Sequence, residues 1–284
     1  MNGYDLKGLA HRALGARGNI LKLRFPDESG VARTAYVPDD ALWGLMREFF
    51  LLKIYQGLGV DLDRRFPVVV DAGAHVGLFS VLLSPRADRV VAIEASPYNF
   101  NLLENNLLVN QIDNVTPVNA ALWTMEGEVG FQTSESSLEG FVSQEGARRV
   151  PTLTLNQLLA EYDRISLLKL DIEGSEVEVL MGASDDALSR VDTILGELEV
   201  EPGRRAEVDA LIEKLQRLGF RTRVVDKTEV YRPSRVIDVV RNWSALRGHL
   251  LLKALQIAYV AAPISKPILK GKYDQVLLFS AERV

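Results

Sequence analysis

Four ionisable side chains lie in or directly after one largely apolar run, and their types are those of acid–base chemistry. The run over residues 165–170 contains Lys169, and Asp171, Glu173 and Glu176 follow it. An apolar run of this length is typical of a buried strand. Carboxylates at the end of a buried strand are costly unless they bind a ligand or a counter-ion. The sequence therefore predicts a ligand-binding or catalytic site at the carboxyl end of this strand.

An earlier stretch has the residues of a ligand-binding turn. Valines 68–70 lead into Asp71, and Gly73 and Gly77 follow. Three consecutive valines predict a strand buried on both faces, as in the centre of a parallel sheet. The glycines permit a sharp turn, and we expect a buried helix over His75–Leu83. Such a turn places free backbone N–H groups at the carboxyl edge of the sheet, where small ligands bind in open α/β folds.

The spacing of this turn restricts the ligand. Dinucleotide folds use G-x-G-x-x-G and P-loops end in Gly-Lys-Ser/Thr, and the stretch over residues 71–77 has neither. Its glycines are spaced G-x-x-x-G instead. A ligand with a nucleoside but no phosphate, such as S-adenosylmethionine (SAM), fits this turn better. The alternative is a tight strand–helix turn that binds nothing.

Two further positions predict contacts to a nucleoside. Glu94 ends the apolar run 90–93, about 20 residues beyond the turn, where nucleotide-binding folds place the acid that holds ribose hydroxyls. The alternative is a solvated strand end. Asn119 is placed to accept a hydrogen bond from an adenine amino group. The predicted cofactor-binding residues are Asp71, Gly73, Ala74, His75, Gly77, Glu94, Ala95, Ser96, Asn119, Ala120 and Asp171.

The rest of the chain supplies the elements that position these residues. Core strands are predicted over residues 90–94, 115–122, 193–199, 220–225 and 275–280, and an amphipathic helix over 204–218. Glu197 and Glu199 lie on the same face of their strand by alternation. A short strand is expected over 128–132, a mobile loop over 133–146, and a strand over 152–155 before a helix capped by Asn156.

Composition excludes several classes of protein. The chain has 284 residues, of which 47% are hydrophobic and 25% charged, as expected for one globular domain with additions. The net charge is -5 and no basic stretch is interleaved with aromatics, which argues against a nucleic-acid partner. The absence of cysteine excludes disulfides, thiolate metal sites and cysteine nucleophiles. A polar N-terminus without a signal-peptide core predicts a cytoplasmic protein.

Three parts of the chain are expected. Residues 1–65 form an N-terminal cap with a helix over residues 5–16, a β-hairpin and an apolar helix, and residues 66–229 with 273–284 form the core. Residues 230–272 form a helical insertion whose apolar stretches are shorter than a bilayer span. The insertion is interpreted as a substrate lid, a partner-binding helix pair or, through residues 236–262, a peripheral membrane contact.

These motifs together resemble those of FkbM-family SAM-dependent methyltransferases. The matching stretches are residues 70–77, 94–100, 103–110 with Asn106 and Asn110, 119–122 and 168–176, within Phe66–Val200. His75 stands where the family usually has Asn, and Glu199 stands where it usually has His. The resemblance implies an α/β, Rossmann-like class I methyltransferase. Its seven-stranded, mostly parallel sheet has an antiparallel last strand, and the insertion between the last two strands emerges beside the SAM site.

The resemblance also implies O-methylation of a hydroxyl on a small-molecule or sugar acceptor, and the apolar insertion favours a lipid-like one. The sulfonium methyl is already activated, so the protein must align the acceptor and remove its proton. Asp171 or Glu173 is the expected group for this, with Glu199 next and Lys169 beside them. Asp71 is expected near the methionine end of SAM, or holding the glycine turn in shape.

Several alternatives remain at this point. Paired carboxylates could bind a divalent metal that acidifies the acceptor hydroxyl, although no metal ligand is assigned. A nucleotide-dependent oxidoreductase requires the missing G-x-G-x-x-G. A non-catalytic methyltransferase-like scaffold or membrane-surface module is the non-enzyme alternative. A homodimer is compatible with the sequence.

Overall fold

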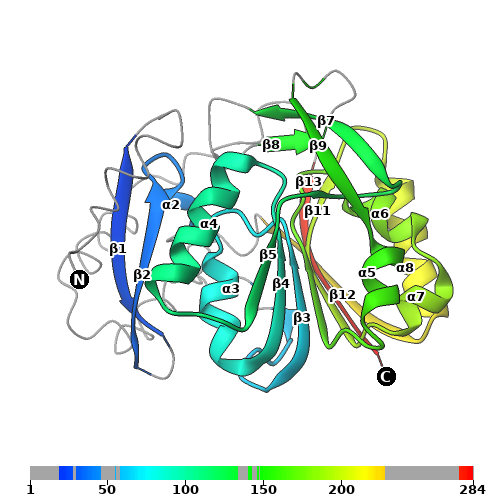
Figure 1. Ribbon diagram of the computed structural model, residues 1–284. Helices are drawn as coiled ribbons and strands as arrows, with labels where there is room; N and C mark the ends of the chain where they lie inside the picture. The colour runs from blue at the N-terminus through cyan, green and yellow to red at the C-terminus, as the bar shows by residue number, and fades with distance from the viewer. Residues whose placement is uncertain are drawn as a thin grey trace, which may run out of the picture.

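A seven-stranded sheet organises the protein (Figure 1). The computed structural model describes residues 19–27, 30–45, 55, 58–133, 140–142, 146, 148–227 and 275–283. The strand order is β12-β13-β11-β10-β3-β4-β5. The strands are β3 (Phe66–Ala72), β4 (Ala87–Ile93), β5 (Val115–Val118), β10 (Leu167–Leu170), β11 (Thr193–Val200), β12 (Phe220–Asp226) and β13 (Gln275–Arg283). Only β13 is antiparallel to its neighbours within this sheet, which confirms the predicted fold class.

Apolar side chains cover both faces of the sheet. Val69 and Val70 are fully buried and contribute to different core clusters, as consecutive residues of a central strand must. One face packs against α3 (Leu78–Leu83) and α4 (Pro97–Val109). The other face packs against α5 (Leu155–Glu161), α6 (Glu176–Gly182), α7 (Asp185–Ser189) and α8 (Arg205–Arg217). Figure 1 shows these two helical layers on either side of the strands.

The region after β5 differs from the predicted single strand over 115–122. The chain turns at Asn119 and Ala120, whose amide donates to Val118 O at 3.2 Å, and leaves the main sheet. A four-stranded sheet of order β6-β9-β7-β8 follows. Its strands are β6 (Ala121–Trp123), β7 (Gly127–Thr133), β8 (Gly140–Val142) and β9 (Arg148–Thr154). The predicted strand over 128–132 is thus confirmed, while part of the predicted mobile loop pairs with it as β8.

Two helix starts also differ from the predictions. Helix α3 begins at Leu78 rather than His75, because His75 and Gly77 have left-handed φ values of 52° and 79°. Thr154, not Asn156, caps α5, since its hydroxyl accepts from Gln157 N and the Gln157 side chain completes a capping box. Asn156 instead accepts a hydrogen bond from Ser184 N at 3.0 Å.

The N-terminal hairpin consists of β1 (Ile20–Pro26) and β2 (Ala32–Pro38), and β2 lies beside α4 (Figure 1). Helix α2 (Leu42–Leu45) is the described part of the apolar helix predicted after the hairpin. The predicted helix over residues 5–16 and the insertion over 230–272, with its stretch 236–262, lie outside the described residues. Within the described part of the chain, no helix has the length and apolarity needed to cross a membrane.

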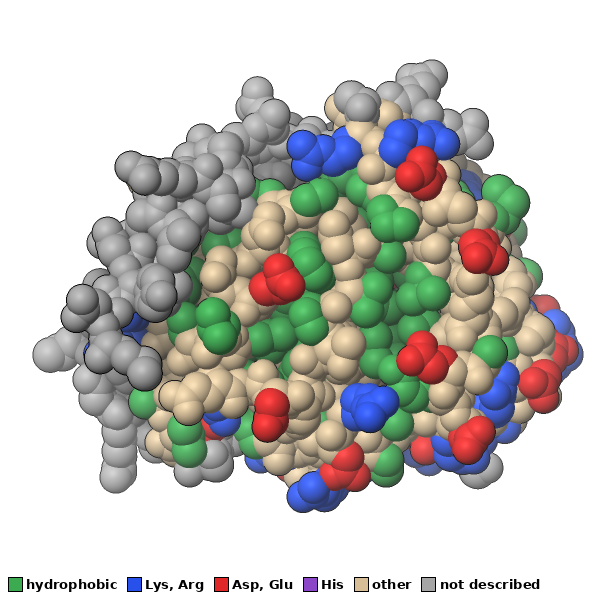
Figure 2. All heavy atoms as spheres, viewed as in Figure 1, with side chains coloured by type: hydrophobic (Ala, Val, Ile, Leu, Met, Phe, Trp, Pro, Cys, Tyr) green, Lys and Arg blue, Asp and Glu red, His purple; other side chains and the backbone are tan. Residues whose placement is uncertain are grey.

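The two edge strands of the sheet are β5 and β12. Strand β5 is an edge strand, and its Pro117 removes one N–H that another chain could pair with. Seen from this side, hydrophobic side chains gather between α4 and α5 with charged ones around them (Figure 2). At the other end, β12 runs parallel to β11 across β13. Lys227, which follows β12, therefore lies at the carboxyl edge of the sheet.

A lysine from α8 caps the C-terminal end of α6. Lys214 Nζ donates to the carbonyls of Leu180, Met181 and Ala183 at 3.1, 3.0 and 2.7 Å. The last carbonyls of a helix have no intrahelical partner, so this buried ammonium satisfies groups that otherwise lose water on folding.

We expect Lys214→Met to lower the free energy of unfolding by about 2 kcal/mol, because three helix-end carbonyls lose a charged donor. Urea denaturation measures the change. Arg217→Met, an exposed position on the same helix, is the control and should change stability by less than about 0.5 kcal/mol. Equal losses in both variants would contradict the capping role.

Candidate active site

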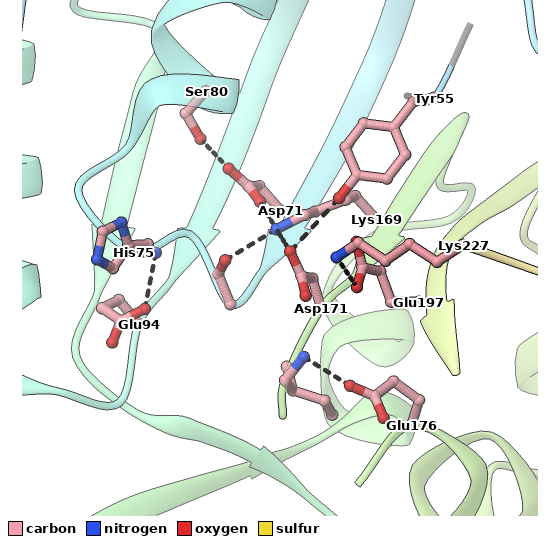
Figure 3. A network of polar contacts seen from close by, with 12 residues as sticks. Tyr55, Asp71, His75, Ser80, Glu94, Lys169, Asp171, Glu176, Glu197 and Lys227 are labelled. Atoms are coloured by element: carbon pink, nitrogen blue, oxygen red, sulfur yellow. Dashed lines mark hydrogen bonds and ion pairs between the residues drawn. The ribbon is translucent and has the colours of Figure 1, made fainter. Parts of the chain in front are cut away.

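A buried ammonium lies between two carboxylates at the carboxyl edge of β3 and β10 (Figure 3). Lys169 Nζ is 3.3 Å from Asp71 Oδ1 and 3.3 Å from Asp171 Oδ2, and it donates to Gly73 O at 2.8 Å. Lys169 pairs with Asp71 in the parallel register of these strands, and its side chain is 3% exposed. The sheet thus joins the two stretches that the sequence singled out.

This arrangement keeps Lys169 and Asp171 ionised. Burial favours the neutral amine, but Asp171 and Asp71 together raise the pKa of Lys169 above its usual value. Burial likewise opposes ionisation of Asp171, yet the ammonium of Lys169, followed by that of Lys227, lowers the pKa of this carboxyl. A carboxylate with a lowered pKa is a weak base, so Asp171 is suited to orient a group rather than to take its proton.

Asp71 and Tyr55 extend this network. Asp71 Oδ2 accepts from Ser80 Oγ at 2.7 Å, which ties the end of β3 to α3. Tyr55 Oη donates to Asp171 Oδ2 at 3.4 Å, and its ring meets Phe79 edge-on with centroids 5.9 Å apart. The sequence prediction missed Tyr55, because a tyrosine within an apolar helical run carries no signal for a polar contact. Figure 3 shows its hydroxyl pointing to Asp171.

The turn after β3 is a tight left-handed bend. Gly73, His75 and Gly77 all have positive φ, and a Cβ on Gly73 would lie 1.7 Å from the carbonyl oxygen of Asp171. The prediction that this turn offers free amides is wrong for its first three residues. Gly73 N and Ala74 N donate to Ile93 O at 3.0 and 2.9 Å, and His75 N donates to Glu94 Oε2 at 2.7 Å. The turn is held against the end of β4 instead.

Glu94 is buried and shared between two backbone amides. Its Oε1 accepts from Ser96 N at 2.8 Å, and its Oε2 accepts from His75 N. Burial raises the pKa of Glu94 to about 7, although both N–H groups and Lys169 act in the opposite direction. A carboxylate offers about four lone-pair positions, so the two oxygens retain capacity for two further donors. These two acceptor positions fit the two hydroxyls of a ribose.

Asn119 stands next to Glu94 at the turn after β5. Its Nδ2 donates to the carbonyls of Glu94 and Ala95 at 2.8 and 3.3 Å. Among the described residues, no donor bonds its Oδ1, so this oxygen remains available as an acceptor. Ala95 packs against the small sheet, and Ala120 is buried beside Asn119. The predicted cofactor residues therefore form two groups, around Lys169 and around Glu94, joined by the turn 73–77.

The loop after β10 is shaped by its own glutamate. Glu176, labelled in Figure 3, accepts through Oε1 from Ile172 N at 2.8 Å. Its Oε2 accepts from Gly174 N at 3.2 Å. Burial, with the charge of Glu199 added, raises the pKa of Glu176 to about 8. Glu173 lies between these amides in a left-handed conformation with φ 61°. Burial, followed by the charges of Glu199 and Asp171, raises the pKa of Glu173 well above its usual value.

The two glutamates of β11 have different surroundings. Glu197 is buried and forms an ion pair with Lys227 at 2.5 Å. Lys227 is the second residue that the sequence prediction missed. Glu199 lines a small cavity with Arg204 and Gly174 instead. Glu199 therefore acts on Glu173 through its charge. Within the described ranges, no three acidic or imidazole side chains converge on one metal position.

Comparison with known proteins identifies the family. The model of the methyltransferase FkbM domain matches residues 71–222, which contain the turn, Glu94, Asn119 and the loop after β10. The chain belongs to the FkbM methyltransferase family. This FkbM-family protein is thus a SAM-dependent methyltransferase, as the sequence motifs predicted.

Several relatives are methyltransferases by name. Methyltransferase sdnD of Sordaria araneosa is 27% identical over 187 residues, which are 52% of this chain and 72% of that protein. Hexuronic acid methyltransferase AglP of Haloferax volcanii is 30% identical over 46% of this chain and 55% of its own. The 31-O-demethyl-FK506 methyltransferase FkbM of Streptomyces tacrolimicus is 28% identical over 67% of this chain and 86% of its own. Among solved structures, TYW2 of M. jannaschii in complex with AdoMet is 14% identical over 94% of this chain and 89% of that chain, with a TM-score of 0.42.

The raised pKa of Glu176 predicts a pH-dependent stability difference. The native carboxyl holds its proton up to about pH 8, while the unfolded carboxyl releases it near pH 4.5, so its contribution to stability is lost as the pH rises through this interval. Gln keeps an acceptor for Ile172 N but none for Gly174 N, and it does not titrate. We therefore expect the free energy of unfolding of Glu176→Gln, relative to that of the wild type at the same pH, to rise by about 4 kcal/mol between pH 5 and pH 9. Urea denaturation at both pH values measures this, and a difference independent of pH would contradict it.

Proposed function

We propose that this FkbM methyltransferase transfers the methyl group of SAM to a hydroxyl oxygen of a small-molecule acceptor. The observation that carries this proposal is the arrangement at the carboxyl edge of β10. A carboxyl with a raised pKa, Glu173, lies beside an ionised carboxylate, Asp171, that a buried ammonium holds in place. An alcohol needs both a base and an orienting acceptor, and two carboxyls with opposite pKa shifts supply them.

The two groups of polar residues supply a site for SAM. The oxygens of Glu94 would accept hydrogen bonds from the ribose hydroxyls, and Asn119 Oδ1 would accept one from the adenine amino group. Ala95, Ser96 and Ala120 would help to hold the adenine, and the turn 73–77 and Asp71 would help to hold the methionine part. When bound, SAM supplies a sulfonium-activated methyl group, so the protein residues need to align the acceptor and accept one proton.

Glu173 accepts the proton of the acceptor hydroxyl as the oxygen takes the methyl group. Its raised pKa makes the carboxylate a stronger base than an ordinary glutamate, and it also means that activity rises with pH as the carboxyl ionises. Asp171 accepts a hydrogen bond from the substrate and so orients the substrate. Lys169 and Tyr55 fix the position of the Asp171 carboxylate. Glu199 favours proton uptake by Glu173 through its negative charge.

The names of two relatives support oxygen as the acceptor atom. One relative is named for a hexuronic acid and another for 31-O-demethyl-FK506. A sugar, or a bulky apolar alcohol of lipid-like character, is the acceptor class we propose.

The acceptor class is tested with purified protein and methyl-labelled SAM. A panel of sugar acids, neutral sugars and bulky apolar alcohols is compared with amines of the same skeletons. We expect label only with alcohols, in a product that mass spectrometry and alkaline stability identify as a methyl ether. Labelling of the amines but not of the alcohols would overturn O-methylation while leaving methyl transfer intact.

We expect Glu173→Gln to reduce kcat by about 10²- to 10³-fold, because Gln keeps the shape of the side chain but accepts no proton. The Kd for SAM, measured by calorimetry, should stay within about twofold, since this residue acts on the acceptor. Glu161→Gln, at an exposed position of α5, is the control and should retain full activity. If Asp171→Asn abolishes turnover while Glu173→Gln retains it, Asp171 is the base.

A further inference from the structure

Two asparagines take the place of a neighbouring strand for β2: Asn106 of α4 and Asn110, the C-cap residue of that helix. Asn106 Oδ1 accepts from Tyr36 N at 2.7 Å, and its Nδ2 donates to Tyr36 O at 3.0 Å. Asn110 makes the same pair of bonds with Thr34, at 2.8 and 2.7 Å. Four residues advance about 6 Å along a helix and two advance about 6.6 Å along a strand, so the spacings match. These four bonds attach the backbone of the hairpin to α4, in addition to the apolar packing of Phe25, Ala35 and Val37 in the core.

Only one of these asparagines also contacts the turn after β3. The Nδ2 of Asn106 donates its second hydrogen to Val76 O at 2.8 Å, and the side chain is fully buried. The second hydrogen of Asn110 goes to Asn106 O within α4, at 2.6 Å. The two residues thus have the same contact with β2 and differ in their contact with the turn.

The carbonyl that Asn106 holds belongs to Val76, which stands next to a strained residue. His75 before it and Gly77 after it both have positive φ. This conformation is unfavourable for His75, which is not a glycine, and it persists only where surrounding contacts impose it. Glu94 supplies one such contact through His75 N, from the sheet side. Asn106 supplies the other from α4, and a Cβ on Gly77 would lie 2.2 Å from Leu103 Cδ1, so the turn fits closely against this helix.

We infer that Asn106 is a positioning residue that couples the N-terminal hairpin to the SAM-binding turn. Docking of β2 orients the carboxamide, the carboxamide fixes Val76 O, and the turn then holds the conformation that binds SAM. Coupling between two sites is reciprocal, so SAM binding also stabilises the docked hairpin. This inference rests on the proposed role of residues 73–77 in holding SAM.

A matched pair of variants tests the coupling. Asn106→Asp places an oxygen against the carbonyls of Tyr36 and Val76, while Asn110→Asp does so against Thr34 and its own helix. We expect both variants to lower Tm, and only Asn106→Asp to weaken SAM binding, with a Kd at least tenfold higher by calorimetry below Tm. Asn110→Asp should stay within twofold of the wild type. Equal changes in Kd, or none in Asn106→Asp, would overturn the inference.

Hydrogen exchange of the wild-type protein gives a second measurement that no folding defect can obscure. Saturating SAM should slow exchange of the Tyr36 and Thr34 amides at least fivefold, and amides in the middle of α8 should change less. Unchanged exchange in β2 of the SAM-bound protein would overturn the coupling alone. A wild-type protein that binds no SAM would overturn the proposed cofactor site and the coupling with it.

Discussion

The buried ammonium of Lys169 is the constraint on which the site depends. A charge excluded from water requires partners of opposite sign, and removing both carboxylates would leave it uncompensated. Asp71 and Asp171 provide those partners only if β3 and β10 are neighbours in their observed register. The same contact requires Gly73, because the turn passes so close to Asp171 that no side chain fits between them. Topology, turn geometry and charge therefore specify one another here.

The carboxyl groups at this edge of the sheet are of two kinds, with either a lowered or a raised pKa. Asp171 shares the ammonium of Lys169 and has a lowered pKa, whereas Glu173 and Glu176 have pKa values raised by burial first and by the charges of other acids second. The distance along the chain between these residues is small, so local sequence alone does not separate them. Their pKa values shift in opposite directions because Asp171 lies against the ammonium of Lys169, whereas Glu173 and Glu176 lie near the charge of Glu199. This separation is what allows neighbouring acids to have different chemical roles.

Much of this arrangement could be predicted from the sequence, because buried parallel strands have unmistakable apolar runs and end in the residues that form the site. Asp71, Glu94 and Asp171 each follow such a run, and the structure brings them to one edge. The small sheet was partly missed, since β6 and β8 have three residues each and show no periodicity. Tyr55 and Lys227 were missed because their polar contacts depend on tertiary packing. The amides of the turn were misjudged because their acceptors, Ile93 O and Glu94, belong to the next strand and the loop after it.

The attachment of the hairpin has a consequence for which of its residues the structure constrains. The carboxamides of Asn106 and Asn110 bond only backbone atoms of β2, so these four bonds place no demand on the side chains of Thr34 and Tyr36. Phe25, Ala35 and Val37 are constrained, because they are buried in the same apolar cluster as the residues of α3 and α4. The family match, which starts at residue 71, includes both asparagines and omits the hairpin that they hold.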